Sequence, residues 1–575
     1  MDKASLPAPG ATASPAEQAK IDAHYLRGSI SQEIESAESV FSRPATSVLK
    51  FHGIYQQDDR DLRKSGVKQF SAMVRVGVPG GVLTSDQYLT LDRLADLGDG
   101  SLRITTRQDI QYHYVPKSRL RELMRGLNES FLSTLAACGD VVRNVTSCPA
   151  PFENEQRREL YPIVKFISQS LKPKSTAYYE IWIDGERAVS AEERTDDEVE
   201  PLYGATYLPR KFKIGFAFPG DNTTDIYAND IGIIPHYEDA QLTGFTILAG
   251  GGMGQSAGVK ASHPRLADPI CSIGPSQEEL LQVVAAIVMI HRDFGNRSNR
   301  KLARLKYVLD AWGVDRFKQE IGSRVGRELA PPKPLTWIRS KDYLGWHEQT
   351  VDSEGRPVWF VGIPVIAGRV KDFDEKRHIR TGLRTIVEQF RPGVRLTCQQ
   401  NLYLSGISDR DRPVIAAMLR EYGISEPAQL PPVLRHAMAC PALPTCGQAI
   451  TESERIMPQL VAEIQAELNE AGLRDQLVDL RTSGCPNGCS RPYTAEIGIV
   501  GASVNMYTIY LGASPLGTRL GTVFAQNVKR PEIAPRLRPV IERYKESRQP
   551  GECFGDFCHR IGIESLRDLS MLAVA

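Results

Sequence analysis

The chain has 575 residues and a formal net charge of +1 at pH 7, with 41% hydrophobic and 24% charged residues. This length corresponds to about four domain-sized units, and the composition is typical of a globular enzyme. The balanced charge excludes a general nucleic-acid binder, which would carry a strong basic excess, and no run of about 18 apolar residues is present to span a membrane.

The first 45 residues are predicted to be an N-terminal extension. They open with MDKASLPAPGATASPAEQAK, which contains neither an apolar signal-peptide core nor an Arg-rich amphipathic pattern. We interpret this opening as a short disordered leader and not as a targeting signal. A cytoplasmic protein is therefore expected.

Strand-like and helix-like segments follow one another along the rest of the chain. Alternating or continuous apolar, β-branched and aromatic residues predict strands within 71–78, 101–115, 177–184, 211–218 and 395–407. Apolar residues at helical spacing predict helices over 277–294 and 459–473. This mixed order favours an α+β (mixed α/β) fold.

Four segments of the first half recur in the same order in the second half. The pairs are LRITTRQDIQY with VRLTCQQNLYL, TSCPA with MACPA, NDIGIIP with AEIGIVG, and FTILAGG with YTIYLGA. The first two pairs share an offset of 292 residues, which places Cys148 on Cys440. Four matches in one order indicate an ancient duplication.

Each half is therefore predicted to hold a small unit followed by a larger unit that begins near the CPA stretch. The Pro-rich segment 420–434 is a candidate linker between the two units of the second half. The predicted segments are 1–45 (extension), 46–135 and 136–330 (small and large units of repeat 1), and 331–425 and 426–575 (small and large units of repeat 2).

Ten cysteines are too few for a disulfide scaffold in a chain of this length. Without an export signal a reducing compartment is expected, so close cysteine pairs indicate metal or redox chemistry. Cys440 and Cys446 form a C-x5-C pair, and Cys485 and Cys489 form a C-x3-C pair. Four thiolates hold either structural zinc or a [4Fe–4S] cluster. Spacing alone leaves both open, and a zinc-stabilised binding protein is the non-enzymatic alternative.

Several basic residues lie in otherwise apolar, strand-like segments. A solvated surface would account for any one of them. Lys211 and Lys213, however, fall on the same face of a strand, where two like charges repel unless an anion lies between them. The basic residues singled out are Arg75, Arg103, Arg107, Arg143, Arg210, Lys211, Lys213, Arg297, Arg300, Lys301, Arg304 and Lys306.

These motifs together resemble the sirohaem and [4Fe–4S] sulfite and nitrite reductase family, in particular its assimilatory sulfite reductase hemoproteins. The motifs that carry the resemblance are ACPALPTC, RTSGCPNGC, LKFHGIYQQDDRD, LRITTRQ, RNV, YLPRKFK, AGGGMG and GNRSNRKLARLKY. The resemblance extends from about Tyr25 to the C-terminus. It implies a pseudo-two-fold arrangement of ferredoxin-like half-domains and two larger sirohaem and cluster domains.

The resemblance also implies roles for individual residues. The cluster ligands would be Cys440, Cys446, Cys485 and Cys489, with Cys489 shared between the cluster and the sirohaem iron. The substrate would be bound by Arg75, Arg143, Lys211 and Lys213. The sirohaem would be contacted by Arg103, Arg107, Gln111, Arg210, Arg304 and Asn487. Cys148 is the only one of the four ligand positions that has a cysteine in the first half, which fits a repeat that has lost its cluster.

The implied activity is the six-electron reduction of sulfite to sulfide. Sirohaem carries eight carboxylates, which suit the planar fork of arginine. Lysines above the iron would bind the oxyanion and relay protons, because crowding by other cations lowers a lysine pKa. The LPRKFK form with two lysines resembles sulfite-preferring members, since two ammonium groups suit a dianion. Nitrite reduction is the alternative.

The electrons are expected to come from another protein. AGGGMGQ at 249–255 is not a dinucleotide-binding fingerprint, because it does not open a helix after a strand. YLGWHEQ, AACGD, CPAPF and RPYTAEIGIVG resemble the ferredoxin-dependent branch more closely than the branch coupled to an NADPH flavoprotein. We therefore predict ferredoxin as the donor, with a flavoprotein as the alternative, and a monomeric chain.

The sequence departs from the family pattern in a few places. Gly447 follows Cys446 where relatives commonly have T-C-P-L-A, a change expected to affect the cluster's packing or potential more than its binding. Cys398 replaces a usually polar residue, and together with Cys553 and Cys558 it is expected to be an ordinary thiol. His52 and His113 are expected to have core or hydrogen-bonding roles.

Overall fold

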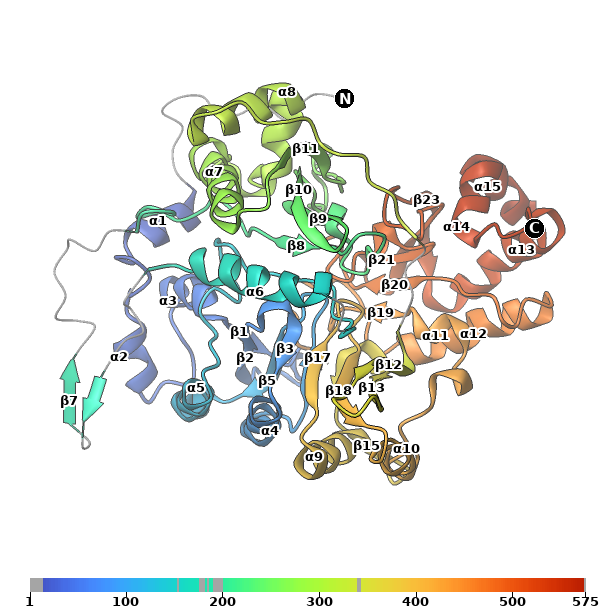
Figure 1. Cartoon of the computed structure of the whole chain (residues 1–575), viewed down its shortest axis with the longest axis horizontal. Helices are drawn as coiled ribbons and strands as arrows, with labels where there is room; N and C mark the ends of the chain where they lie inside the picture. The colour runs from blue at the N-terminus through green and yellow to red at the C-terminus, as the bar shows by residue number, and fades with distance from the viewer. Residues whose placement is uncertain are drawn as a thin grey trace.

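Two small antiparallel sheets, one from each repeat, each take their last strand from the other repeat. The computed structural model describes residues 14–152, 155–174, 181–183, 186–189, 200–338 and 343–572 (Figure 1). The first sheet has the order β1 (Ile54–Asp58), β2 (Phe70–Val76), β5 (Ile110–Val115), β4 (Leu102–Ile104) and β14 (Arg369–Val370). The second has the order β12 (Gly345–Val351), β13 (Pro357–Ile363), β18 (Leu402–Ser408), β17 (Gly393–Leu396) and β3 (Val82–Leu83).

Glycine makes this exchange of strands possible. Gly81 precedes β3 and Gly368 precedes β14, and both have a positive φ, of 74° and 73°. A Cβ on Gly81 would lie 2.4 Å from the carbonyl oxygen of Leu396, and one on Gly368 would lie 2.1 Å from that of Ile104. Only glycine lets the two backbones approach so closely with this conformation.

Helices α4 (Ser85–Leu94) and α5 (Leu120–Glu129) cover the first sheet, and α9 (Ile379–Phe390) and α10 (Arg412–Glu421) cover the second. Leu91, Leu123, Ile386 and Ile415 from these four helices belong to one continuous apolar core. The small units of the two repeats therefore share a core, which fixes the relative position of the repeats by burial of apolar surface.

The two larger units also repeat one design. In repeat 1 the sheet has the order β11 (Asp268–Ile273), β10 (Gln241–Ala249), β9 (Ile231–Glu238) and β8 (Ile214–Phe216), with β8 and β9 parallel. In repeat 2 the order is β19 (Met438–Ala439), β20 (Leu480–Ser483), β21 (Ile497–Ser503), β22 (Met506–Leu511) and β23 (Thr522–Lys529), with β19, β20 and β21 parallel.

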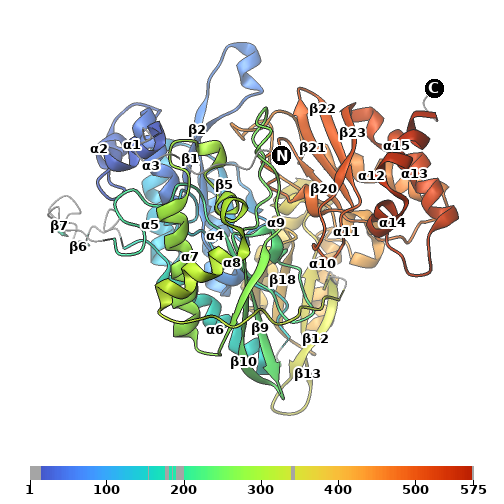
Figure 2. The same ribbon diagram turned by 90° about the horizontal axis from the view of Figure 1, so that it is seen from above.

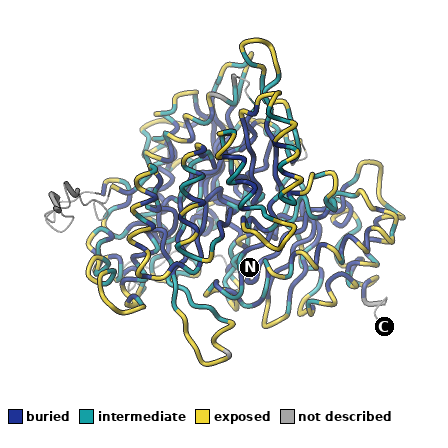
Figure 3. The backbone as a smooth tube through the Cα atoms, turned by 90° about the horizontal axis from the view of Figure 1, so that it is seen from below, coloured by how far each residue is buried: buried dark blue, intermediate teal, exposed yellow. Residues whose placement is uncertain are grey.

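Their helices pack on the outer faces. Repeat 1 contributes α6 (Glu155–Ser170), α7 (Gln277–Phe294) and α8 (Leu305–Val325). Repeat 2 contributes α11 (Pro432–Arg435), α12 (Met457–Glu470), α13 (Ile533–Ser547), α14 (Phe554–Ile561) and α15 (Ile563–Leu572). Seen from above, β20–β23 and their helices lie on one side of the molecule and β9 with α6–α8 on the other (Figure 2). Buried residues follow the sheets and the inner helix faces (Figure 3).

The predicted strands and helices are found close to where the sequence places them. Segment 101–115 forms β4 and β5 joined by a turn, segment 395–407 lies within β17 and β18, and the helix predicted over 277–294 has those bounds. Of the strand predicted over 177–184, only β6 (Ile181–Ile183) lies within the described residues. The candidate linker 420–434 contains the end of α10 and most of α11. No helix of the described part is long and apolar enough to cross a membrane.

The prediction of a disordered leader is wrong for its last residues. Residues 15–21 form α1 (Pro15–Ile21), followed by α2 (Ile30–Glu35) and α3 (Arg43–Leu49). Lys20 donates to Glu17 at 2.5 Å and lies 3.2 Å from Asp140, and all three side chains are buried. This pairing with a residue of the large unit orders a segment whose composition alone indicated disorder. Residues 1–13 lie outside the described part.

Candidate functional site

Two equivalent turns hold the CPA segments of both repeats. Gln108 and Gln400 both have a left-handed backbone, with φ of 57° and 67°. Gln108 donates to the carbonyl of Ser147 at 3.0 Å and accepts from its amide at 2.9 Å. Gln400 does the same with Ala439, at 3.0 and 3.1 Å. Both glutamines matched in the duplicated sequence, but the alignment alone did not indicate this clamping role.

The two cysteine pairs meet at one edge of the repeat 2 sheet. Cys440 follows β19 and Cys485 follows β20, and these strands are parallel neighbours, so their carboxyl ends lie together. Cys440 and Cys485 are buried, Cys446 is half-buried and Cys489 is exposed. Burial, and then the nearby thiols of Cys489, Cys446 and Cys485, raise the pKa of Cys440 to about 12. The structure thus brings the four predicted ligands together.

Polar N–H groups point at these sulfurs. The Gly484 amide donates to the Cys440 Sγ at 3.3 Å, and the Asn487 Nδ2 donates to the Cys485 Sγ at 3.5 Å. Such donors stabilise anionic cluster sulfur, and four convergent cysteines are the donor set of a [4Fe–4S] cluster, so the residues present fit that group. Among the described residues, no group of three or more His, Cys, Asp or Glu side chains is arranged to hold a single metal ion.

Arg60, which the sequence did not single out, covers the first cysteine loop. Its Nη1 donates to the carbonyl of Ala449 at 2.6 Å and to that of Cys446 at 3.3 Å, and its backbone amide donates to Pro444 at 3.2 Å. Arg60 lies in the loop between β1 and β2, so the first repeat contacts the cysteine loop of the second. Its place within the motif LKFHGIYQQDDRD was the available signal.

The four predicted substrate residues gather on one side of this edge. Arg75 comes from β2. When the side-chain amide of Gln111 is oriented with its oxygen toward Arg75, that oxygen accepts hydrogen bonds from Nε (3.2 Å) and Nη2 (2.5 Å). Arg143 donates to the carbonyl of Gly139 from Nε (3.3 Å) and Nη2 (3.2 Å). Lys211 and Lys213 are half-buried, and within the described part of the chain their ammonium groups have no hydrogen-bond or ion-pair partner.

The two lysines have strongly lowered pKa values. Burial lowers the pKa of Lys211 to about 7, with Arg143 and Arg210 acting in the same direction and the Cys489 thiolate against it. Burial, and then the charge of Lys211, lowers the pKa of Lys213 well below its ordinary value. The Cys489 charge acts on both groups, which places the lysines on the Cys489 side of the site.

The predicted sirohaem residues divide into two groups. Arg107 donates to Asn229 Oδ1 at 2.8 Å and to the carbonyl of Asn144, and burial lowers its pKa to about 10. Arg210 has a pKa lowered to about 10 by burial and by Arg300. Arg304 binds Asp230 with both Nε (3.1 Å) and Nη2 (2.8 Å). These three lie near the lysines.

The other members lie nearer the cysteines. Arg103 donates to Glu454 at 3.0 Å and to the carbonyl of Ala439 at 2.8 Å, directly before Cys440. Asn487 and Gln111 make the contacts to Cys485 and Arg75 given above. Arg103 thus joins the small unit of repeat 1 to the cluster edge through a paired charge.

The cationic side of the site fits an anionic group with several carboxylates. The buried Nε of Arg107 lacks a hydrogen-bond partner in the described part of the chain. A buried guanidinium donor without a partner, beside two unpaired ammonium groups, is unfavourable unless an anion accepts its hydrogen bond and pairs with the positive charges. The residues present therefore fit sirohaem as well as a small oxyanion.

Asp109 and Lys306 belong to this region but were not predicted as site residues. Asp109 is buried, and both of its carboxylate oxygens lack a well-aligned hydrogen-bond donor among the described residues. Burial raises its pKa to about 6, although the charges of Arg75 and Arg107 act to lower it. Lys306 is fully buried and donates to the carbonyls of Gly252 (3.1 Å) and Gly254 (2.9 Å). Both lie inside quoted motifs, and Lys306 is also one of the basic residues singled out in the sequence.

Lys306 holds the glycine-rich loop against the second cysteine loop. The amide of Gln255 donates to Pro486 at 2.9 Å. A Cβ on Gly251 would lie 2.1 Å from the carbonyl oxygen of Tyr227, so the close approach requires glycine. AGGGMG thus supports the loop of Cys485 and Cys489.

The remaining cysteines and histidines have other surroundings. Cys148 donates to Asp221 at 2.8 Å and accepts from Arg157 at 3.0 Å. Cys398, Cys553 and Cys558 are buried, and burial raises their pKa values. The side chain of His52 is hydrogen-bonded to the Leu26 carbonyl at 2.8 Å, and His113 is buried, which agrees with the core roles expected of both.

Two protein families match this sequence. The family described as "Nitrite/Sulfite reductase ferredoxin-like half domain" matches residues 66–130 and 352–422, once in each repeat. The family described as "Nitrite and sulphite reductase 4Fe-4S domain" matches residues 165–329. The repeated half-domain confirms the predicted α+β class with duplicated ferredoxin-like half-domains.

Relatives and a solved structure extend the likeness to nearly the whole chain. "Sulfite reductase [ferredoxin]" of Synechococcus elongatus is 42% identical over 97% of this chain and 92% of its own. "Sulfite reductase [NADPH] hemoprotein beta-component" of Geobacillus kaustophilus is 42% identical over 98% of both chains. The structure of Mycobacterium tuberculosis NirA protein has the same fold, with a TM-score of 0.75 and 22% identity over 96% of both chains. The chain therefore belongs to the nitrite and sulfite reductase family as a sulfite reductase, with the [4Fe–4S] cluster and sirohaem as its cofactors.

Proposed function

We propose that this chain is an assimilatory sulfite reductase, which reduces sulfite to sulfide with six electrons from ferredoxin. The observation that carries the proposal is the pair of ammonium groups of Lys211 and Lys213, which have no anionic partner within the described residues and lie on the Cys489 side of the site. Two adjacent cations suit a doubly charged oxyanion better than a singly charged one. Sulfite is therefore favoured over nitrite.

In this proposal Cys440, Cys446 and Cys485 would hold the cluster, and Cys489 would serve both the cluster and the sirohaem iron. The cofactors, when bound, supply single electrons and the metal centre at which sulfite is reduced. The carboxylates of sirohaem would be bound by the cationic and amide residues of the site. These residues are Arg103, Arg107, Gln111, Arg210, Arg304 and Asn487.

The proposed substrate residues have different roles because their pKa values differ. Arg75 and Arg143 stay charged at any physiological pH, so they bind oxyanion oxygens and do not supply protons. Each oxygen of sulfite leaves as water and needs protons. Lys211, with a pKa of about 7, holds a proton at Nζ that it can give up near neutral pH. Burial, and then the charge of Lys211, lower the pKa of Lys213 as well, and a bound oxyanion favours the ammonium form of both lysines.

The donor is proposed to be ferredoxin because several segments resemble that branch, and the Synechococcus relative carries that name at 42% identity. A second candidate is a hemoprotein component that receives electrons from an NADPH flavoprotein. It is favoured by the names of several relatives with 40–42% identity. A cytoplasmic, monomeric protein remains a prediction.

The test uses purified full-length protein containing both cofactors. Sulfite and nitrite turnover are measured with reduced ferredoxin, and separately with NADPH and a sulfite reductase flavoprotein. We expect a higher kcat/KM for sulfite than for nitrite, and turnover with ferredoxin. Turnover with the flavoprotein alone would contradict the donor assignment. Protein that contains zinc and has no sirohaem absorption would contradict the whole proposal.

A further inference from the structure

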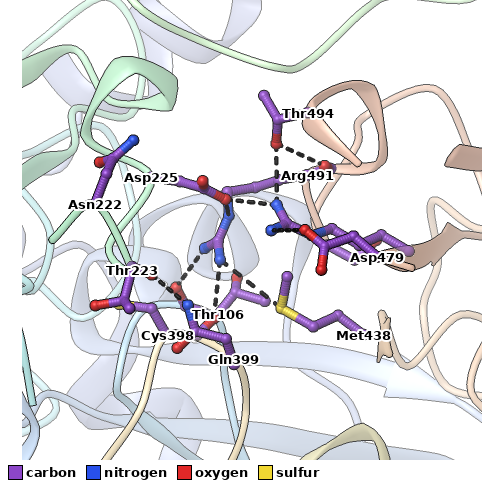
Figure 4. Close-up of polar contacts among 12 residues, drawn as sticks. Thr106, Asn222, Thr223, Asp225, Cys398, Gln399, Met438, Asp479, Arg491 and Thr494 are labelled. Atoms are coloured by element: carbon purple, nitrogen blue, oxygen red, sulfur yellow. Dashed lines mark hydrogen bonds and ion pairs between the residues drawn. The ribbon is translucent and has the colours of Figure 1, made fainter. Parts of the chain in front are cut away.

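Two buried residues of opposite charge occupy equivalent positions in the two repeats. Asp225 directly precedes η7 (Ile226–Ala228), and Arg491 directly precedes η11 (Pro492–Thr494). Both have a left-handed backbone, with φ of 50° and 58°. The Arg491 Nε donates to the Asp225 Oδ2 at 2.6 Å, so the two repeats are joined through equivalent positions (Figure 4).

The same guanidinium donates to two carbonyls that are themselves equivalent. Its Nη1 donates to Thr106 at 3.0 Å and its Nη2 to Cys398 at 2.9 Å. Thr106 and Cys398 are related by the 292-residue offset that relates Cys148 to Cys440. Arg491 therefore contacts both equivalent turns as well as Asp225, the residue equivalent to itself (Figure 4). We infer from these contacts that it lies on the internal pseudo-two-fold axis.

Two carboxylates face the two arginines on this axis, because Arg481 also lies 3.7 Å from Asp479. Asp225 also accepts from the Arg481 Nη1 at 2.5 Å, and Arg481 donates to the Thr494 Oγ1 at 3.0 Å. The side chains of Asp225, Arg481 and Arg491 are all buried. A buried carboxylate shared by two arginines forms charge-assisted hydrogen bonds of fixed geometry, which orient the Arg491 fork.

This fork lies between the two parts of the proposed cofactor junction. Arg491 is two residues beyond Cys489, and Thr106 directly precedes Arg107. The Thr106 Oγ1 also donates to the carbonyl of Cys489 at 3.1 Å. Arg491 and Thr106 therefore connect the loop of the proposed shared thiolate to the turn of a proposed sirohaem-binding arginine.

We propose that Arg491 is a positioning residue, which holds the Cys489 loop of repeat 2 in register with the Thr106–Arg107 turn of repeat 1. The inference rests on the proposed function, because it assigns Cys489 and Arg107 to the junction of the cofactors. Loss of the fork changes the relative position of the two cofactors, whereas the substrate residues Arg75, Arg143, Lys211 and Lys213, which do not contact Arg491, keep their places. It therefore lowers kcat and leaves the KM for sulfite almost unchanged.

The experiment compares Arg491→Met and Arg491→Lys with Arg380→Met in full-length protein containing cofactors. Arg380 is a matched control because it is buried and also joins the two repeats, through Asp92 at 2.8 Å and Asp96 at 2.7 Å. It lies on α9 against α4, away from the cysteine loops. Iron and acid-labile sulfide, the visible absorption and electron paramagnetic resonance spectra, kcat, KM and Tm are measured for each protein.

In Arg491→Met we expect shifted haem and cluster spectra at unchanged iron and sulfide content, and a kcat about tenfold lower with KM within about twofold of wild type. Arg491→Lys retains the charge but not the fork, so it falls between wild type and Arg491→Met. Arg380→Met lowers Tm but keeps the wild-type spectra and a kcat within about twofold.

Wild-type spectra and kcat in Arg491→Met would overturn the proposal. Failure of both Arg491 variants to fold, with Arg380→Met folded, would assign Arg491 a structural role only and would overturn it as well. Wild-type protein without sirohaem absorption would instead refute the proposed function. The two failures are thus distinguishable.

Discussion

Cys148 and Cys440 occupy equivalent places in the two repeats, but their surroundings differ. Equivalent glutamines clamp the residues directly before them, Ser147 and Ala439, with hydrogen bonds of 2.9–3.1 Å. Around Cys440 lie three further thiols whose charges raise its pKa. Around Cys148 lie the carboxylate of Asp221 and the guanidinium of Arg157.

The comparison separates the scaffold from its chemistry. Equivalent glutamine hydrogen bonds hold the backbone before the two cysteines in both repeats, whereas the groups around the thiols differ. In repeat 1 an acid and a base satisfy each other around the thiol. In repeat 2 four thiols converge, an arrangement unfavourable for thiolates unless a metal cluster takes up their charge. The donor set, and not the fold, thus distinguishes a cofactor site from a closed polar cluster.

The largest expected effect is the loss of the cluster from repeat 2. Cys446→Ser removes one of the four thiolates, so the protein should lose its iron–sulfur absorbance and its sulfite turnover should fall at least about 100-fold. Iron and acid-labile sulfide analysis with visible spectroscopy checks this. Cys148→Ser, at the equivalent edge of repeat 1, is the matched control and should keep both cofactors. Full cluster absorbance in Cys446→Ser would contradict the assignment of this ligand.

The second effect concerns the proposed proton donor, Lys211, which repeat 1 contributes to the site. Lys211→Met removes an ammonium group but leaves the cysteine loops intact, so cofactor content should be unchanged while sulfite turnover falls about 100-fold. Steady-state kinetics on samples of equal sirohaem content measures this. Lys301→Met is the control, because Lys301 is exposed in the neighbouring basic segment. Unchanged turnover in Lys211→Met would rule out the proton relay.

A third, smaller effect is a shift in pH dependence. Burial and then the charges of Arg143 and Arg210 lower the pKa of Lys211 to about 7. Because the ammonium form gives the proton, turnover should fall as pH rises through this pKa. Arg210→Gln removes one repelling cation, so the pKa rises and the alkaline limb of the kcat/KM profile moves to higher pH. A limb that stays in place, or moves to lower pH, would contradict this assignment.

Much of this comparison could be predicted from the sequence. The duplication aligned Gln108 with Gln400 and Cys148 with Cys440, and motif spacing placed both cysteine pairs in repeat 2. These features depend on local patterns that survive in one chain. The roles of the site residues remain a proposal, but the structure places the four cysteines at one edge and the substrate cations beside it.

The parts that could not be predicted depend on pairings between distant residues. Arg60 covers a loop almost four hundred residues further along the chain, Arg103 pairs with Glu454, and Asp225 pairs with Arg491. No local periodicity indicates which buried acid meets which buried base, because the partner is set by the exchange of strands between the repeats. Helix α1 was missed for the same reason, since its order depends on Asp140.

The smallest expected effect tests the closed polar cluster of repeat 1. Arg157→Met removes the guanidinium that lies 3.6 Å from the Asp221 carboxylate. It also removes the hydrogen-bond donor to the Cys148 sulfur. Asp221 keeps the Thr223 amide at 3.0 Å, so only part of its hydrogen bonding is lost and the cost is about 2 kcal/mol. For a unit of about 195 residues this lowers Tm by about 4–8 °C. Calorimetry measures the shift. Arg316→Met is the control, because Arg316 is an exposed cation over the Trp312 ring of the same unit.

Sirohaem and cluster absorbance should be unchanged in Arg157→Met, because the repeat 2 edge keeps all its contacts. A loss of cofactor in Arg157→Met would mean that the repeat 1 cluster still supports the metal site, and that the two edges are not independent.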